Sequence, residues 1–106
     1  MNYQVYTCTL TQPAGDNPVV NVLENQLEGT VEWTANENGT VIGTLAGAFP
    51  MGKTKFLFTT DLVNGPAFIS CGREDDDHVS VTSLNFSGTG VDGLFNDTLL
   101  EIRIYY

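Results

Sequence analysis

The sequence predicts an all-β fold, a single-domain antiparallel β-sandwich of jelly-roll-like type that spans residues 1–106. Short runs that alternate apolar and polar residues recur about eight times along the chain. Gly, Pro, Asn and Asp separate these runs at the ~8 to 12-residue spacing of a sandwich or a barrel. No stretch of twelve residues has a sustained helical period, and 106 residues suffice for one hydrophobic core. A small closed β-barrel is the alternative fold.

The first two predicted strands flank a turn. Residues 3–11 alternate apolar and polar side chains, which places one set on each face of a strand. Residues 18–24 form an apolar run after the segment 13–17, which consists mostly of turn-forming residue types. The sequence therefore predicts two strands joined by a loop.

The next two strands are predicted to form a tight hairpin. Residues 30–34 and 40–45 face each other across the segment 36–39. This segment ends in Asn38-Gly39, a pair that tolerates positive φ at both positions, as tight hairpin turns require.

Four more strands are predicted in the second half of the chain, over residues 55–59, 67–71, 79–84 and 99–105. In the last strand one face carries Leu100, Ile102, Ile104 and Tyr106, and the other carries Glu101, Arg103 and Tyr105. This strand runs to the final residue, where a free end would fray unless sheet pairing held it. We therefore expect it to pair centrally or to pack against a neighbouring subunit.

Composition narrows the possible partners. Four Lys and Arg stand against thirteen Asp and Glu, a net charge of −9, so phosphate backbones and anionic membranes repel the chain. We expect no nucleic-acid partner and no membrane partner. The N-terminus has no basic segment followed by an apolar one, so no signal peptide is predicted, and no run of eighteen apolar residues occurs. The protein is expected to be soluble.

Residues suited to catalysis are few. His78 is the only histidine and would have to serve as every imidazole base, and no Gly-x-Ser-x-Gly motif is present. A Cys71–His78 pair meets the same objection, since Cys71 sits in an apolar run. Cys8 and Cys71 are both expected to be buried, reduced thiols rather than a disulfide. We predict no catalytic residue, no cofactor and no enzymatic activity.

The one concentration of charge is the run Glu74-Asp75-Asp76-Asp77-His78. Carboxylates are ligands for Ca²⁺, but adjacent residues in an extended chain point apart, whereas a calcium loop needs several oxygens to converge. A solvated turn between two strands is the favoured interpretation, and we predict no metal site. Asp92, Asn96 and Asp97 allow the same weak metal interpretation, and Gly88–Gly93 is expected to be loop rather than a phosphate site.

Aromatic residues leave one binding function open. Trp33 is expected to be a core anchor, on a hairpin that also carries Val31 and Ile42. A sugar-stacking platform would form if the following residues gathered on one face: Tyr3, Tyr6, Trp33, Tyr105 and Tyr106. Aromatic residues in strands usually belong to a core or an interface, so glycan binding is the less favoured alternative.

Several segments resemble a module found in tailed bacteriophages. The matching segments, in order, are Tyr6–Gln12, Val22–Asn25 with Leu27, Gly29–Trp33, Thr44–Leu45, Gly47–Pro50, Lys53–Thr54 and Asn96–Tyr105. In that module segments like YTALLTQ, VLEN-LGGTVxW, TLxGAFPxxKT and N-T-x-I-E-I-R-V-Y recur in this order. The resemblance covers both ends and the centre of the chain and weakens over residues 55–95.

The resemblance implies a virion-associated protein made in the host cytoplasm. It is similar to head-decoration and head-fibre proteins, so the expected function is capsid decoration or stabilisation through protein–protein interfaces. The implied partners are virion proteins such as the major capsid protein. The terminal strand and the open sheet edges also predict a homo-oligomer, for which a trimer is favoured. A tail or fibre subunit, a host-surface glycan-binding adhesin, and a small enzyme or inhibitor are the competing classes.

Overall fold

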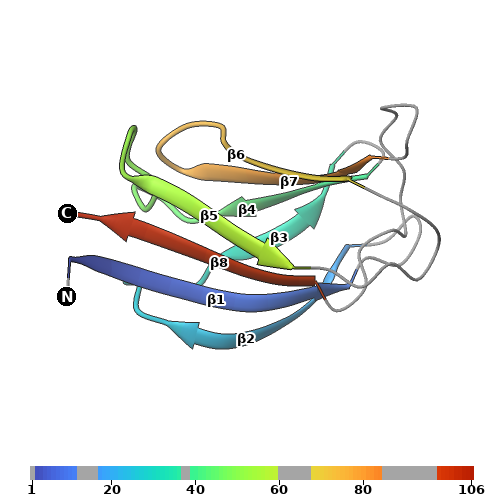
Figure 1. The fold of residues 1–106 in the computed structure, drawn as a ribbon, viewed down its shortest axis with the longest axis horizontal. Helices are drawn as coiled ribbons and strands as arrows, with labels where there is room; N and C mark the ends of the chain where they lie inside the picture. Colours follow the sequence, from blue (N-terminus) through green and yellow to red (C-terminus); the bar gives the residue numbers. More distant parts are fainter. Residues whose placement is uncertain (1, 12–16, 37–38, 60–67, 85–97) are drawn as a thin grey trace.

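The computed structural model describes residues 2–11, 17–36, 39–59, 68–84 and 98–106, and within them it contains strands and no helix. Each of the eight predicted runs coincides with a strand, with ends that differ by at most two residues. The strands are β1 (Tyr3–Thr11), β2 (Val19–Asn25), β3 (Glu32–Ala35), β4 (Thr40–Thr44), β5 (Thr54–Thr59), β6 (Phe68–Arg73), β7 (His78–Leu84) and β8 (Thr98–Tyr105) (Figure 1).

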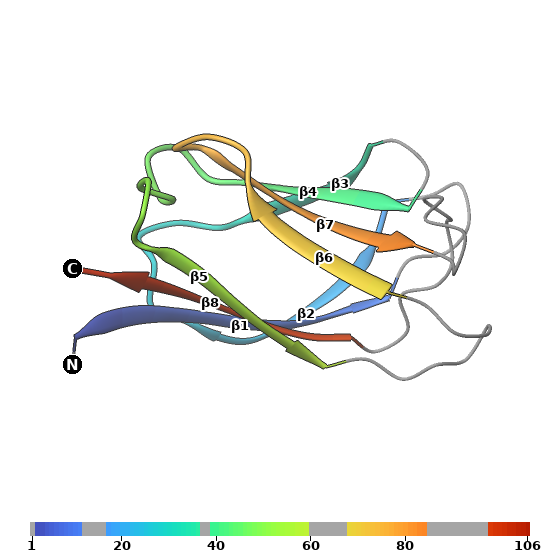
Figure 2. The same cartoon turned by 45° about the horizontal axis from the view of Figure 1, so that its top comes forward.

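The strands form two four-stranded sheets. Sheet A has the order β2-β1-β8-β5, and sheet B has the order β3-β4-β7-β6. All neighbouring strands run antiparallel. Figure 2 shows the two sheets as two layers facing each other. The predicted antiparallel β-sandwich is confirmed, and the alternative of a closed barrel is wrong because each sheet ends in unjoined edge strands.

The core lies between the sheets and follows the two-residue period of the sequence. On β7 every second residue is buried, including Val79 and Val81, while the residues between them are less buried. The other fully buried apolar side chains come mainly from β1 and β8: Tyr6, Cys8, Leu10, Leu100 and Ile102. Tyr106, predicted to share the inner face of the last strand, lies beyond the end of β8 and is 74% exposed.

The first and last strands are the two central strands of sheet A. β1 pairs with β8 along its length, from Tyr3 opposite Tyr105 to Leu10 opposite Thr98. Both chain ends therefore lie at the same end of the sandwich (Figure 1). Central pairing of the terminal strand is confirmed.

The predicted hairpin is formed by β3 and β4. Asn36 donates its backbone N–H to the carbonyl of Thr40 at 2.9 Å, which closes the connection. Gly39 has a φ of 78°, a left-handed conformation that favours glycine. Asn38, its predicted partner in the turn, lies outside the described residues.

Trp33 links the two sheets. Its side chain is only 8% exposed, and its indole Nε1–H donates to the Tyr6 hydroxyl at 3.0 Å, from sheet B to sheet A. Gly43 lies opposite Trp33 on β4, and a Cβ there would come within 2.9 Å of the indole ring. The prediction of a core anchor is confirmed. Val31 is buried with it, whereas Val41 rather than Ile42 faces the core.

Candidate functional site

The structure separates the two residues of the candidate catalytic pair. Cys71 packs against the core and pairs with buried Val81, so it faces inward. His78 precedes inward-facing Val79 on β7 and therefore faces outward. Burial raises the pKa of Cys71 to about 11 and that of Cys8 to about 12. Both thiols are free, and at neutral pH neither is a thiolate nucleophile.

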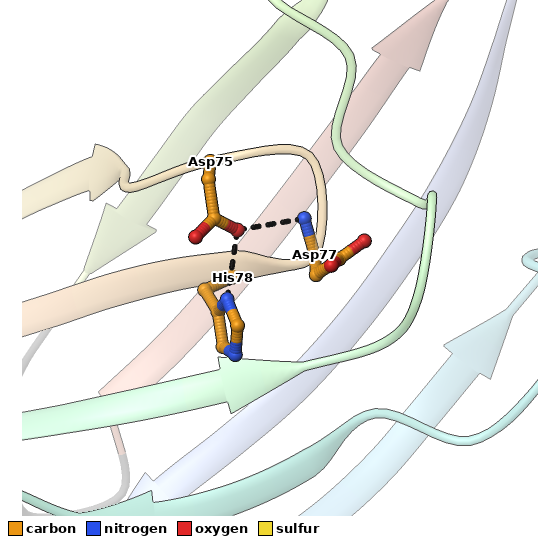
Figure 3. Close-up of side chains that lie close together, drawn as sticks. All are labelled: Asp75, Asp77 and His78. Atoms are coloured by element: carbon orange, nitrogen blue, oxygen red, sulfur yellow. Dashed lines mark hydrogen bonds and ion pairs between the residues drawn. The ribbon is translucent and has the colours of Figure 1, made fainter.

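The acidic turn, residues 74–77 between β6 and β7, is exposed, as predicted, but its carboxylates are engaged. Asp75 Oδ1 accepts hydrogen bonds from the backbone N–H of Asp77 at 2.8 Å and from Nδ1 of His78 at 2.7 Å (Figure 3). The hydrogen bond with His78, together with that from Asp77, lowers the pKa of Asp75 below its ordinary value of 3.8. The hydrogen bond to Asp75 holds His78 in a local turn structure.

The same turn also holds the loop that connects β4 to β5. The carboxylate of Asp77 accepts the backbone N–H of Gly47 at 2.7 Å, and the carbonyl of Asp76 accepts that of Phe49 at 2.9 Å. Arg73 forms an ion pair with Asp76 and donates to the carbonyl of Phe49 at 2.6 Å. The acidic residues therefore stabilise a contact between two loops.

Three side chains of this region come close enough to be considered as metal ligands. Asp75, Asp77 and His78 each offer an atom within 4.8 Å of the others (Figure 3). Ca²⁺ requires about six to eight oxygen ligands, and one oxygen of each aspartate already accepts a backbone N–H group. This cluster is therefore explained as turn structure. The other candidate ligands, Asp92, Asn96 and Asp97, and the segment Gly88–Gly93 lie outside the described residues.

The five aromatic residues do not gather on one face. Tyr6 and Trp33 are buried in the core. Tyr3 and Tyr105 lie side by side on the outer face of sheet A, with ring centroids 5.1 Å apart. The guanidinium of Arg103 lies 4.8 Å from the centre of the Tyr3 ring, within cation–π range. The predicted platform is thus reduced to one aromatic pair and its arginine.

The outer face of sheet B carries a polar hollow of about 390 Å³. The lining residues are Asn36, Thr40, Ile42, Glu74, His78, Ser80 and Thr82. Two of its groups already bind each other, since the Ser80 hydroxyl donates to a Glu74 carboxylate oxygen at 2.8 Å. Among the described residues that line this hollow, the imidazole of His78 is the only aromatic ring.

Exposed large apolar side chains concentrate on sheet A. Among the described residues, six of the eight such side chains lie on its strands and none lies on a strand of sheet B. The six are Val19, Val22 and Leu23 on β2, Leu57 and Phe58 on β5, and Leu99 on β8. We call these six residues the apolar set of sheet A. Exposed apolar patches on soluble proteins commonly mark interaction sites.

The sequence analysis missed this set, although a signal for it exists. β2 contains Val22-Leu23 and β5 contains Leu57-Phe58, each a pair of consecutive apolar residues. Successive side chains of a strand point to opposite faces, so one member of each pair must leave the core. A departure from strict alternation therefore marks strands that are apolar on both faces.

Positive charge gathers beside the apolar set. Three of the four Lys and Arg residues, namely Lys53, Lys55 and Arg103, lie at the β5–β8 side of sheet A. Lys55 and Arg103 are directly opposite each other across these strands. Arg103 pairs with Glu101 at 2.6 Å, whereas Lys55 forms no ion pair within the described part of the chain.

The chain matches no protein-family model, no curated protein and no solved structure. Within the described residues, no helix is long and apolar enough to cross a membrane.

Proposed function

We propose that this chain is a non-enzymatic structural protein of a tailed-phage virion, a capsid decoration or head-fibre component that acts through protein–protein interfaces. The observation that carries the interface role is the concentration of exposed large apolar side chains on sheet A. Exposed apolar side chains on a protein of net charge −9 favour association with specific partners, because the remaining surface keeps the protein in solution.

The chemistry of the described residues supports a role without catalysis. Burial raises the pKa values of both cysteines, and His78 is hydrogen-bonded to Asp75 in a turn. A nucleophile and a base that lie on opposite faces of a sheet cannot act together. Binding is therefore the better account of how this surface works.

The virion role rests on the segments that resemble phage modules. Of these, the described parts form strands, turns and core, so the resemblance concerns a scaffold rather than a reactive site. The partners we propose are other copies of this chain and the major capsid protein. A decoration protein is repeated over a symmetric shell, so many modest contacts suffice to hold and stabilise it.

Co-sedimentation with capsids tests this function. Purified protein is mixed with capsids that lack it, and saturable binding together with a raised capsid melting temperature is expected. Leu99→Ser, on the outer face of sheet A, should weaken binding, whereas the matched change Ile42→Ser, on the outer face of sheet B, should not. Absence of binding to heads, or labelling confined to tails, would contradict the capsid assignment.

Glycan binding is the second candidate, favoured by the paired rings of Tyr3 and Tyr105 beside Arg103. Aromatic faces beside a polar group are typical of sugar-binding surfaces. If this surface binds host glycans, Tyr105→Ala should abolish retention of the protein on host cells, and Phe56→Leu, at a partly buried side chain that packs against the core, should not. Equal retention of wild type and Tyr105→Ala would exclude this surface.

A further inference from the structure

We propose that copies of this chain join through the two edges of sheet A, with β5 of one copy pairing antiparallel to β2 of the next. This inference deepens the proposed function by naming the partner of one surface, a second copy of the chain. Its test uses the purified protein alone. Failure of self-association is therefore distinguishable from failure to bind capsids.

Both edges are open within the described part of the chain. β5 has β8 as its single sheet neighbour, and β2 has β1. An edge strand presents unpaired N–H and C=O groups that another strand can satisfy. β5 and β2 are of similar length, six and seven residues, so one edge can cover the other.

Strand directions make the junction antiparallel without any change of orientation. β1 runs antiparallel to both β2 and β8, and β8 runs antiparallel to β5. β5 therefore runs antiparallel to β2 of the same copy. A second copy placed beside the first in the same orientation brings its β2 antiparallel to β5, and the core-facing sides of the two sheets stay continuous.

The backbone hydrogen bonds show which groups of β5 are available. The carbonyl of Lys53 accepts the N–H of Tyr105 at 2.8 Å, so the backbone of Lys53 faces β8. In an antiparallel ladder the backbone groups of successive residues point alternately to the two sides. Thr54, Phe56 and Phe58 therefore direct their N–H and C=O groups toward the free edge.

The same reasoning gives the available groups of β2. Gln26 donates its N–H to the carbonyl of Val5 at 2.9 Å, so Gln26 and, by alternation, Glu24 face β1. Asn25 faces the free edge. Pairing Thr54 of one copy with Asn25 of the next brings Lys55 opposite Glu24. The β-bulge of β2 between Glu24 and Val22 then shifts the alignment by one residue, so that Phe56 comes opposite Val22.

This register joins opposite charges on the same face of the sheet. Lys55 is the cross-strand partner of Arg103, and Glu24 is the partner of Thr7, so both side chains lie on the outer face. Within one copy Lys55 stands opposite a like charge, an arrangement that destabilises a sheet. Glu24 of the next copy offers Lys55 an ion pair, which no described residue of its own copy provides. In this position the two side chains form a non-hydrogen-bonded pair, in which side chains approach closely.

Exposed apolar side chains make the two edge strands complementary beyond the charged pair. Leu57 is 46% and Phe58 41% exposed on β5, and Val19, Val22 and Leu23 are exposed on β2. Antiparallel addition brings these parts of the two strands together, beyond the Lys55–Glu24 pair. The junction thus has apolar side chains beside one opposite-charge pair, a composition typical of specific protein interfaces.

Charge exchange tests the junction by sedimentation velocity on purified protein. Lys55→Glu and Glu24→Lys should each weaken self-association at least about tenfold, because each places like charges at the junction. The double variant with both changes restores opposite charges and should regain wild-type association. An equimolar mixture of the two single variants should also associate. Glu32→Lys, an exposed change on β3 of sheet B, is the matched control and should associate like wild type.

Phe58→Pro provides a test of strand addition itself. Proline removes an N–H that points to the free edge and leaves the β5–β8 ladder intact, so the variant should be a folded monomer. Far-ultraviolet circular dichroism and a cooperative thermal melt verify the fold of every variant. A wild-type protein that is monomeric at high concentration overturns the proposal. So does a Lys55→Glu variant that associates normally, or a charge-exchanged double variant that fails to recover.

Discussion

Trp33 donates a hydrogen bond to Tyr6, and its ring packs closely over Gly43. Its burial was predictable, since a large aromatic residue in an alternating strand usually faces the core. Its partner was not, because Tyr6 lies in the other sheet and 27 residues away in the sequence. Likewise, Gly43 was part of a predicted strand, but nothing local indicated that it makes room for a ring.

Truncation of Trp33 should destabilise the sandwich strongly. Trp33→Ala is expected to lower the free energy of unfolding by about 3 to 5 kcal/mol, because it leaves a cavity between the sheets. Tyr6→Phe should cost less, about 1 to 3 kcal/mol, because it leaves the buried indole N–H without its acceptor. Urea denaturation measures both. A water-exposed Trp33 fluorescence maximum in the folded protein would contradict the burial of this residue.

Gly43 should not tolerate a side chain. Gly43→Ala places a methyl group within 2.9 Å of the Trp33 ring and is expected to destabilise the protein by about 1 to 3 kcal/mol. Trp33→Phe removes the ring atoms that the methyl group would meet. In the Trp33→Phe background Gly43→Ala should therefore cost much less, a non-additivity that denaturation of the four proteins measures. Additive effects would contradict the explanation that Gly43 leaves room for the Trp33 ring.

The stability of the fold should fall in alkaline solution. Burial raises the pKa of Cys8 from 9.0 to about 12, of Cys71 from 9.0 to about 11 and of Tyr6 from 10.0 to about 12. Each group holds its proton more tightly in the folded protein than in the unfolded chain. Its contribution is complete below the unfolded pKa and is lost as pH rises through the folded one.

Thermal melts at increasing pH measure this effect. The melting temperature is expected to decline from about pH 9 upward, because unfolding then releases protons. Cys71→Val removes one titrating group and should flatten part of the decline, while Cys8 and Tyr6 preserve the rest. A melting temperature that stays constant well above pH 9 would contradict the burial of these three groups.

At the scale of one element, the acidic turn lies where the sequence predicts it, but the sequence did not indicate that it contacts a second loop. A run of carboxylates between two strands predicts an exposed turn, and residues 74–77 are exposed. Their contacts with Gly47 and Phe49 were not predictable, because those residues are about thirty positions earlier in the chain. Local composition determines the presence of a turn, whereas the partners of a turn depend on how the strands assemble.

The turn should respond to loss of an acceptor and not to calcium. Asp77→Ala removes the oxygen that binds the Gly47 N–H and should lower the melting temperature, whereas Asp77→Asn retains an acceptor oxygen and should have little effect. Because one oxygen of each aspartate is engaged in the turn and Ca²⁺ needs about six to eight oxygen ligands, millimolar calcium or chelator should leave the melting temperature of wild type unchanged. A shift of several degrees with calcium, abolished when Asp75 and Asp77 are both replaced by Asn, would show a bound ion.

For the whole molecule, the number, limits and class of the strands were predictable, but their distribution between sheets was not. Alternation is local and identifies each strand by itself. The placement of β5 beside β8 depends on pairing between residues about fifty positions apart, such as Thr54 and Ile104. The apolar set of sheet A becomes visible only once β2 and β5 are known to be the edges of the same sheet. For this reason the candidate interface emerged from the structure rather than from a motif.

The salt dependence of self-association should separate two effects: repulsion between copies that each carry a large negative charge, and attraction between Lys55 and Glu24 at the junction. Each copy carries a net charge of −9, and at about 10 mM salt the Debye length of about 30 Å is comparable to the molecule's longest dimension of 37 Å. Repulsion between whole molecules then opposes association. At about 150 mM salt the Debye length falls to about 8 Å, which screens distant charges but leaves an ion pair in contact.

We therefore expect self-association to strengthen between these two salt concentrations and to persist at higher salt through the apolar contacts of β5 and β2. Sedimentation velocity at each concentration measures it. The variant that combines Lys55→Glu with Glu24→Lys has an unchanged net charge, so it should follow the same salt dependence as wild type. Association that is strongest at the lowest salt would mean that the Lys55–Glu24 pair outweighs the net repulsion, because only opposite charges at the junction are weakened by added salt.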